Sequence, residues 1–249
     1  MLHANVAEGV HRIEDAYVNW YLVEDGDALT IVDAGHPASW GSLHRALRAI
    51  GRPPGEIEAV VLTHGHFDHL GFAERARRTF GVPVWAPTAD QPLAAHPWRY
   101  DHERSRLRQA ATHPSFIRVF ATMGAAGALW VRGCRQTRGY EPGTTLDVPG
   151  HPIAVPTPGH TLGHCALLFP RRGALLTGDA LVTFDPYTGR RGPRIVSGAA
   201  TADSARALGS LDALAELDAR VLLPGHGGQW YGSPGRAVQQ ARAAATTRR

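Results

Sequence analysis

Short apolar runs separated by turn residues mark the start of the chain. Runs of strand length occupy residues 10–13, 19–23 and 29–33, and Asp25-Gly26-Asp27 separates the last two. No glycine-rich phosphate loop follows them. This pattern predicts a meander of β-strands rather than a nucleotide-binding β-α-β unit.

Helical spacing of apolar residues replaces this pattern further along the chain. Residues 39–50 carry apolar side chains along one helical face, and a glycine and two prolines follow. We therefore expect a helix over this segment. A second helix is predicted over residues 71–80 and a further strand over residues 83–86.

Histidine and aspartate residues follow directly on several apolar runs. Val60-Val61-Leu62-Thr63 leads into His64-Gly65-His66-Phe67-Asp68-His69. Three further runs end in Pro158-Gly159-His160, Gly178-Asp179 and Pro224-Gly225-His226. Glycine permits a tight turn, and sites in open α/β sheets form beyond the strand ends. These side chains are therefore expected to face one common crevice.

The chemistry of this cluster points to metal binding. Imidazole and carboxylate groups together suit zinc or a similar first-row divalent ion. Seven such residues from four segments make just under two tetrahedral shells, as expected for two metals that share a carboxylate and a hydroxide. A polar loop with chance histidines would explain one such residue, but it does not explain the cluster.

With these motifs, the sequence resembles the metallo-β-lactamase superfamily and, within it, the glyoxalase-II-like hydrolases. The matching segments are 63–69, 157–164, 177–181 and 224–227, which occur in the order typical of the family. The resemblance implies an α+β fold, a four-layer αβ/βα sandwich, in which residues 1–249 form a single domain. It also implies two metal sites and a bridge: His64, His66 and His160 hold one ion, Asp68, His69 and His226 hold the other, and Asp179 joins them.

The expected activity is the hydrolysis of an ester, thioester or lactone-type bond in a small-molecule substrate. A hydroxide that bridges two zinc ions would attack the carbonyl carbon, with Asp68 and Asp179 positioning it. Iron and manganese fit the same ligand types as zinc. Two alternatives stay open. One is a sulfur dioxygenase that acts on a persulfide with a single iron held by His64, His160 and Asp179, and the other is a metal-binding module without catalysis.

Residues 91–140 depart from the strand pattern and are expected to form a helical insertion, because a structureless loop of this length is uncommon. The insertion either lies over the active site, with Trp98 as part of the substrate wall, or packs its aromatic side chains against the body of the protein. Tyr187 and Arg190, in the loop after Asp179, are the other candidate substrate contacts. A surface turn with solvated arginines is the alternative for that loop.

Three residues near the motifs have candidate supporting roles. Asp33 either orients the metal-binding loop from behind or caps a turn. His164 is expected to support or pack against the site rather than bind metal, because His160 ends its strand directly. Cys165 is expected to be a buried structural thiol.

The amino-acid composition limits the catalytic chemistry, the partners and the cellular location that are expected for this chain. All 26 basic side chains are arginine, so a lysine nucleophile or Schiff base is excluded. The formal net charge is +4 and the arginines are scattered along the sequence, which makes nucleic acid an unlikely partner. The chain starts without a signal-peptide pattern, and its apolar runs are much shorter than the roughly 20 residues that cross a bilayer. A cytoplasmic protein is expected.

Overall fold

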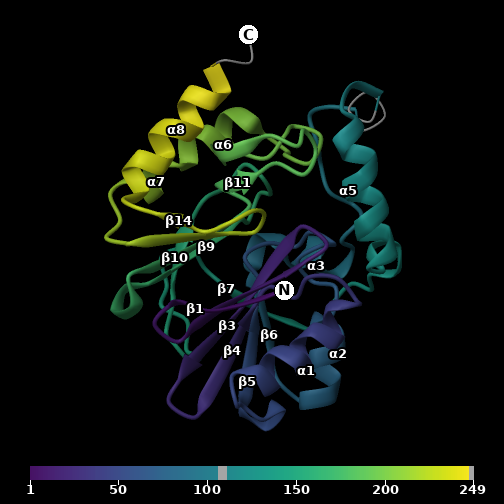
Figure 1. Ribbon diagram of the computed structural model, residues 1–249, viewed down its shortest axis with the longest axis vertical. Helices are drawn as coiled ribbons and strands as arrows, with labels where there is room; N and C mark the ends of the chain where they lie inside the picture. The colour runs from purple at the N-terminus through teal and green to yellow at the C-terminus, as the bar shows by residue number, and fades with distance from the viewer. Residues whose placement is uncertain (106–110, 247–249) are drawn as a thin grey trace.

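Two β-sheets lie face to face in the computed structural model of the chain, which describes residues 1–105 and 111–246 (Figure 1). In the first sheet, seven strands lie side by side in their order along the chain. These strands are β1 (Leu2–Ala7), β2 (Val10–Asp15), β3 (Val18–Asp25), β4 (Ala28–Val32), β5 (Ile57–Val61), β6 (Val84–Pro87) and β7 (Thr137–Tyr140). The strands from β1 to β4 pair antiparallel, and those from β4 to β7 pair parallel.

The second sheet comes from the C-terminal half of the chain. Its five strands lie in the order β14-β13-β10-β9-β8. Their bounds are β8 (Ile153–Pro156), β9 (Cys165–Phe169), β10 (Ala174–Gly178), β13 (Val221–Pro224) and β14 (Trp230–Tyr231). A separate two-stranded sheet pairs β11 (Val182–Phe184) with β12 (Arg191–Arg194).

Helices cover the outer faces of both sheets (Figure 1). The first sheet carries α1 (Ser39–Ala49) and α2 (Ala73–Phe80), drawn in blue at the bottom of the figure. The second sheet carries α6 (Ser204–Ser210), α7 (Asp212–Ala215) and α8 (Pro234–Thr246), drawn in green and yellow at the top. The predicted four-layer αβ/βα sandwich is confirmed.

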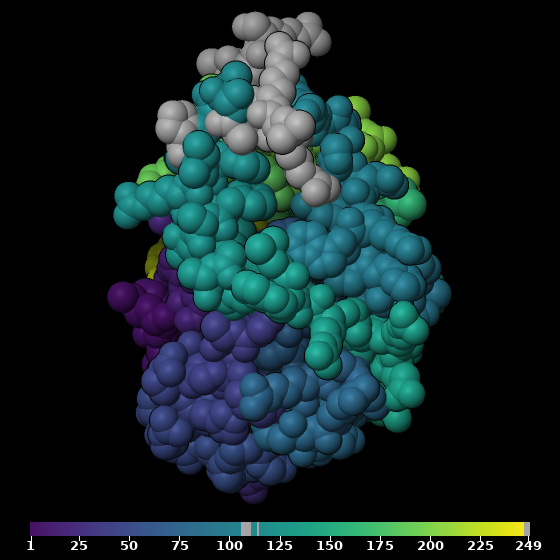
Figure 2. Space-filling view, turned by 90° about the vertical axis from the view of Figure 1, so that its right-hand side faces the viewer, coloured from purple at the N-terminus to yellow at the C-terminus, as the bar shows by residue number. Residues whose placement is uncertain are grey.

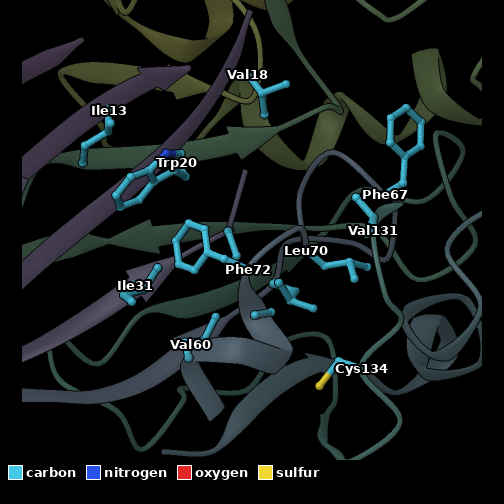
Figure 3. Packing of buried hydrophobic residues seen from close by; sticks show 14 of the residues in the cluster. Ile13, Val18, Trp20, Ile31, Val60, Phe67, Leu70, Phe72, Val131 and Cys134 are labelled. Atoms are coloured by element: carbon cyan, nitrogen blue, oxygen red, sulfur yellow. The ribbon is translucent and has the colours of Figure 1, made fainter. Parts of the chain in front are cut away.

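Successive side chains of a strand point to opposite faces of its sheet, so each strand contributes to two apolar layers. In β3, Trp20 and Leu22 point toward the helices, whereas Tyr21 and Val23 point toward the second sheet. The Trp20 ring meets the edge of the Phe72 ring at a centroid distance of 5.2 Å, and Figure 3 shows this pair within the helix-facing cluster. A third apolar cluster packs α6 to α8 against the outer face of the second sheet.

The segment from residue 91 to 140 is only partly helical. It contains α3 (Gln91–Ala95) and α5 (Pro114–Ala125), and residues 106–110 lie outside the described part. Its last four residues form β7, so the expected helical insertion is wrong at this end. β7 is an edge strand in which Tyr140 is the one buried residue, and so it lacks an alternating apolar pattern. Figure 2 views this side, where teal atoms of this part of the chain lie next to the blue N-terminal part.

Short 3-10 helices complete the described elements. They are η1 (Pro54–Glu56), η2 (Thr88–Asp90), η3 (Ala128–Trp130) and η4 (Pro170–Arg172). The helices predicted over 39–50 and 71–80 are present as α1 and α2, whereas β1 was not predicted. Within the described residues, no helix is long and apolar enough to cross a membrane.

Candidate metal centre

The seven candidate ligands lie together where strands of both sheets end. Their donor atoms form three groups, within each of which the atoms lie no more than 4.8 Å apart. The groups are His64, His66 and His160; His64, His69 and Asp179; and Asp68, His69 and His226. All seven side chains are buried. The structure therefore brings together the residues that the four sequence motifs singled out.

Asp179 lies between the histidines of the cluster. Its Oδ2 atom is 3.1 Å from Nε2 of His226 and 3.3 Å from Nε2 of His160, while its Oδ1 atom is 3.5 Å from Nε2 of His69. A side chain at Gly225 would place its Cβ 2.2 Å from Oδ1 of Asp179, so the Pro-Gly-His loop needs glycine there. The carboxylate thus faces histidines from three different segments.

Hydrogen bonds behind the cluster decide which nitrogen of His64 faces it. The Thr63 hydroxyl donates to Oδ2 of Asp33 at 2.9 Å, so at the 3.0 Å contact with His64 it accepts from Nδ1. Nε2 of His64 then carries a lone pair that points into the cluster. Asp33 also accepts from the Thr63 backbone N–H at 2.8 Å and contacts Nδ1 of His69 at 3.0 Å. Asp33 therefore orients the metal-binding loop, which was one of its two expected roles.

Hydrogen bonds at Nδ1 also orient the rings of His160 and His226. The Thr201 hydroxyl donates to the carbonyl of Val196 at 3.0 Å, so it accepts from Nδ1 of His160 at 3.2 Å. Nδ1 of His226 donates to the carbonyl of Tyr17 at 2.7 Å. In both residues Nε2 is thereby the nitrogen that faces the cluster, and a metal bound there would need this atom without a proton.

The turn that supplies the Tyr17 carbonyl has an uncommon backbone. It joins β2 to β3, and both of its central residues have positive φ, 50° at Ala16 and 69° at Tyr17. Such turns usually contain asparagine or glycine because other side chains are strained there. Strain of this kind persists where the surrounding structure fixes it, and here it holds the acceptor for His226.

Several buried atoms of the cluster are placed to receive a cation. Nε2 of His64, Nε2 of His69 and Oδ1 of Asp179 are buried and have no hydrogen-bond partner among the described residues. Nε2 of His160, which carries a lone pair, lies only 3.0 Å from Nδ1 of His66. Buried acceptors that converge in this way are costly unless a proton or a cation lies between them. The donor set therefore fits first-row metal ions.

The electrostatics divide the cluster into two parts. Burial, with the neighbouring histidines, lowers the pKa values of His64 and His160 well below 6.5, so both are neutral. Burial also acts to lower the pKa of His69, but the carboxylates of Asp179, Asp68 and Asp33 outweigh it and raise that pKa to about 10. Despite burial, Asp179 likewise raises the pKa of His226. A proton on His69 takes a place that a metal would occupy.

His164 supports the cluster from behind. Its Nε2 atom accepts a hydrogen bond from the backbone N–H of Asp179 at 3.0 Å, and its Nδ1 atom lies 2.8 Å from the Thr157 hydroxyl. Burial lowers the pKa of His164 to about 3, so the ring stays neutral and its acceptor stays available. This position matches the expected supporting role.

Sequence reasoning missed Asp90, which joins two of the ligand loops. Its buried carboxylate accepts hydrogen bonds from the backbone N–H of Gly65 at 3.0 Å, the Thr161 hydroxyl at 2.7 Å and the backbone N–H of Gly163 at 2.7 Å. The one available signal was its place three residues after a strand, the layout shared by the other site residues.

A pocket of about 360 Å³ opens beside His66 and His160. Its wall includes the apolar side chains of Leu93 and Leu162 and the phenol of Tyr100, whose ring lies 4.4 Å from that of His66. The pocket therefore reaches two of the candidate ligands, His66 and His160. Its size lies near the lower end of typical small-molecule sites.

The three candidate substrate residues are not part of this pocket wall. Tyr187 is 6% exposed, and its hydroxyl lies 3.4 Å from that of Tyr100. Trp98 is 40% exposed and stacks on Phe67, with ring centroids 4.3 Å apart. Arg190 is exposed. Tyr187 and Trp98 therefore contact residues next to the candidate ligands, whereas Arg190 faces solvent.

Both cysteines are free and buried. Burial raises the pKa of the Cys165 thiol, and likewise that of Cys134, to about 12. The expected structural thiol at Cys165 agrees with this environment.

The sequence is similar to those of proteins in one known superfamily. The sequence pattern of the metallo-beta-lactamase superfamily matches residues 13–226. The probable metallo-hydrolase YflN of Bacillus subtilis is 26% identical over 251 residues, which cover 89% of this chain and 84% of that protein.

Solved structures share the fold. A metallo-beta-lactamase family protein from Thermus thermophilus superimposes with a TM-score of 0.67 at 25% identity, over 93% of this chain and 75% of the other. The protein TTHA1623, solved in a di-iron-bound form, gives a TM-score of 0.60 at 23% identity, over 92% of this chain and 96% of the other.

Proposed function

Because the chain belongs to the metallo-beta-lactamase superfamily, we propose that it is a hydrolase with two metal ions, preferentially zinc, acting on a small-molecule substrate. The bond cleaved is of the ester, thioester or lactone type. The observation that carries this proposal is the position of Asp179, whose two carboxylate oxygens face histidines from separate ligand groups.

We assign His64, His66 and His160 to one ion and Asp68, His69 and His226 to the other. Each set is one of the groups of converging donor atoms in the structure. The third group, which combines His64 and His69 with Asp179, draws on both sets. Such mixing is expected when two sites adjoin and share a carboxylate.

When bound, such ions lower the pKa of a coordinated water to about 7 and polarise the carbonyl group of a substrate. The protein contributes orientation and charge. The carboxylates of Asp68 and Asp179 are hydrogen-bond acceptors that orient the attacking water, and the Nδ1–H contacts behind His64, His160 and His226 fix the ligand rings. Burial strengthens these interactions because little bulk water screens them.

Substrate is expected to enter through the pocket beside His66 and His160. Leu93 and Leu162 give this pocket apolar surface, and Tyr100 offers a hydroxyl near the ligand group. An acyl chain or ring on the apolar wall would bring its carbonyl group toward the histidines.

The dioxygenase alternative requires a single iron held by His64, His160 and Asp179. It leaves Asp68, His69 and His226 without a role, although their donor atoms converge as closely as those of the other groups. A binding module without catalysis is disfavoured by the completeness of the ligand set, because a site that has lost catalysis is expected to have lost ligands as well. Both are outcomes of the test below.

The test is metal analysis of protein purified without added metal, followed by turnover of a panel of thioesters, lactones and phosphodiesters. We expect about two metals per chain, mainly zinc, and hydrolysis of a carbonyl substrate. His226→Ala should lose one of the two metals, whereas His151→Ala, which replaces an exposed histidine, should keep both. One iron per chain with oxygen uptake on glutathione persulfide would establish the alternative instead.

A further inference from the structure

A groove of about 670 Å³ lies between α2 and the segment from residue 130 to 136. None of the candidate metal ligands lines it. The segment after α5 that forms one wall belongs to the teal part of the face seen in Figure 2. The groove is larger than the pocket beside His66 and lies within the size range of small-molecule sites.

The groove concentrates the positive charge of the protein. Five arginines line it against one acidic residue, Glu74: they are Arg75, Arg77, Arg78, Arg132 and Arg135. Five positive charges against one negative charge equal the net +4 of the whole chain, so the rest of the chain is formally balanced. The arginines look scattered in the sequence, but the fold brings these five together. A cleft lined by charge of one sign attracts ligands of the opposite sign.

Two of these guanidinium groups are available for a ligand. Arg77 donates to Glu74 at 2.8 Å and Arg78 at 2.6 Å, so the single carboxylate is already engaged. Arg132 and Arg135 are exposed, and neither forms an ion pair with any residue in the described part of the chain. Guanidinium groups bind phosphate through paired N–H donors, which makes an oxyanion their natural partner.

An exposed aromatic ring adds a second element of recognition. Trp130 lines the same groove, and its side chain is 72% exposed. An indole face stacks on a nucleobase, and such stacking contributes about 1–3 kcal/mol per base in other proteins. Thr79 and Gln136 add polar groups along the wall.

From this combination of clustered guanidinium groups and an open indole face, we propose that the groove binds a nucleoside polyphosphate. Arg132 and Arg135 contact the phosphates, and Trp130 stacks on the base. The site is separate from the candidate metal centre, and the proposal does not depend on the reaction at that centre.

The test is isothermal titration of the metal-loaded protein with ATP, with pyrophosphate and with a hexaglutamate peptide. We expect ATP to bind more tightly than pyrophosphate, and the peptide to bind weakly. Removal of both guanidinium groups in R132A/R135A should weaken ATP binding at least tenfold. Trp130→Ala should weaken ATP binding by about tenfold but leave pyrophosphate binding unchanged.

A matched control removes two arginines elsewhere. R206A/R236A replaces exposed residues on α6 and α8, so it lowers the net charge equally without touching the groove. This variant should bind ATP as the unmodified protein does. Absence of ATP binding would overturn the proposal, as would equal ATP affinity in R132A/R135A, which would place the nucleotide outside the groove. Peptide binding as tight as ATP binding would show a surface for acidic proteins instead.

Discussion

Nδ1 of His69 lies 3.0 Å from Oδ2 of Asp33, and this contact turns Nε2 of His69 toward the candidate metal centre. Asp33 has a positive φ of 58°, an uncommon conformation that aspartate tolerates better than most residues. The carboxylate thereby reaches both the His69 ring and the backbone of Thr63. One strained residue thus orients both ends of the ligand loop, at Thr63 and at His69.

Metal binding should release protons. The pKa of His69 is raised to about 10, so at pH 7.5 the metal-free protein holds a proton there, and a metal must displace it. Affinity should therefore rise with pH until about pH 10, where His69 has already lost its proton. Calorimetry of zinc binding in buffers with different ionisation enthalpies should give at least about one released proton per chain. Binding heats that do not change with the buffer would contradict this.

Asp179→Ala should impair both chemistry and metal binding. It removes the carboxylate that faces His69, His160 and His226, together with the negative charge that balances two dications. We expect activity to fall by at least roughly 10²-fold, with fewer metals retained after dialysis. Asp147→Ala, at an exposed aspartate, is the control. A variant with full rate and metal content would remove Asp179 from the site.

Asp90→Ala should destabilise the fold as well as the site. It leaves the backbone N–H groups of Gly65 and Gly163 buried without their acceptor. The expected loss in the free energy of unfolding is at least about 2 kcal/mol, measured by urea denaturation. Asp101→Ala, also an aspartate but exposed, should change it by less than about 0.5 kcal/mol. Equal stability of the two variants would show that Asp90 does not hold the loops together.

Trp98→Ala and Tyr187→Phe should change substrate preference while metal content stays constant. The first removes the ring that stacks on Phe67, and the second removes the hydroxyl beside that of Tyr100. We expect the ratio of kcat/KM between two substrates to change by roughly 10-fold for Trp98→Ala and less for Tyr187→Phe. Loss of every activity together with the metals would point to misfolding, and unchanged ratios would place both residues outside substrate recognition.

The sequence identified the residues of the candidate centre because each follows an apolar run at a strand end. His64 follows a strand of the first sheet, whereas Asp179 and His226 follow strands of the second, and these strand ends meet at the candidate centre. The groups that support the ligand histidines could not be identified in this way. The Tyr17 carbonyl and the Thr201 hydroxyl act through tertiary proximity, and no local pattern marks them.

Two further features of the structure were not predicted from the sequence. β7 has one neighbouring strand and one buried residue, so periodicity did not reveal it. The groove unites Arg77 and Arg78 on α2 with Arg132 and Arg135, far along the chain. Charge counted along the sequence therefore gave no sign of a concentrated basic surface.

The division of the candidate centre between the two sheets has a consequence for how the protein matures. His64, His66, Asp68 and His69 belong to the N-terminal half, while His160, Asp179 and His226 come from the half that forms the second sheet. During synthesis the first half emerges with an incomplete set of donors, so full metal loading must wait until the second half has docked. A substitution at the sheet interface, remote from every ligand, would then produce chains of normal secondary structure that are poor in metal.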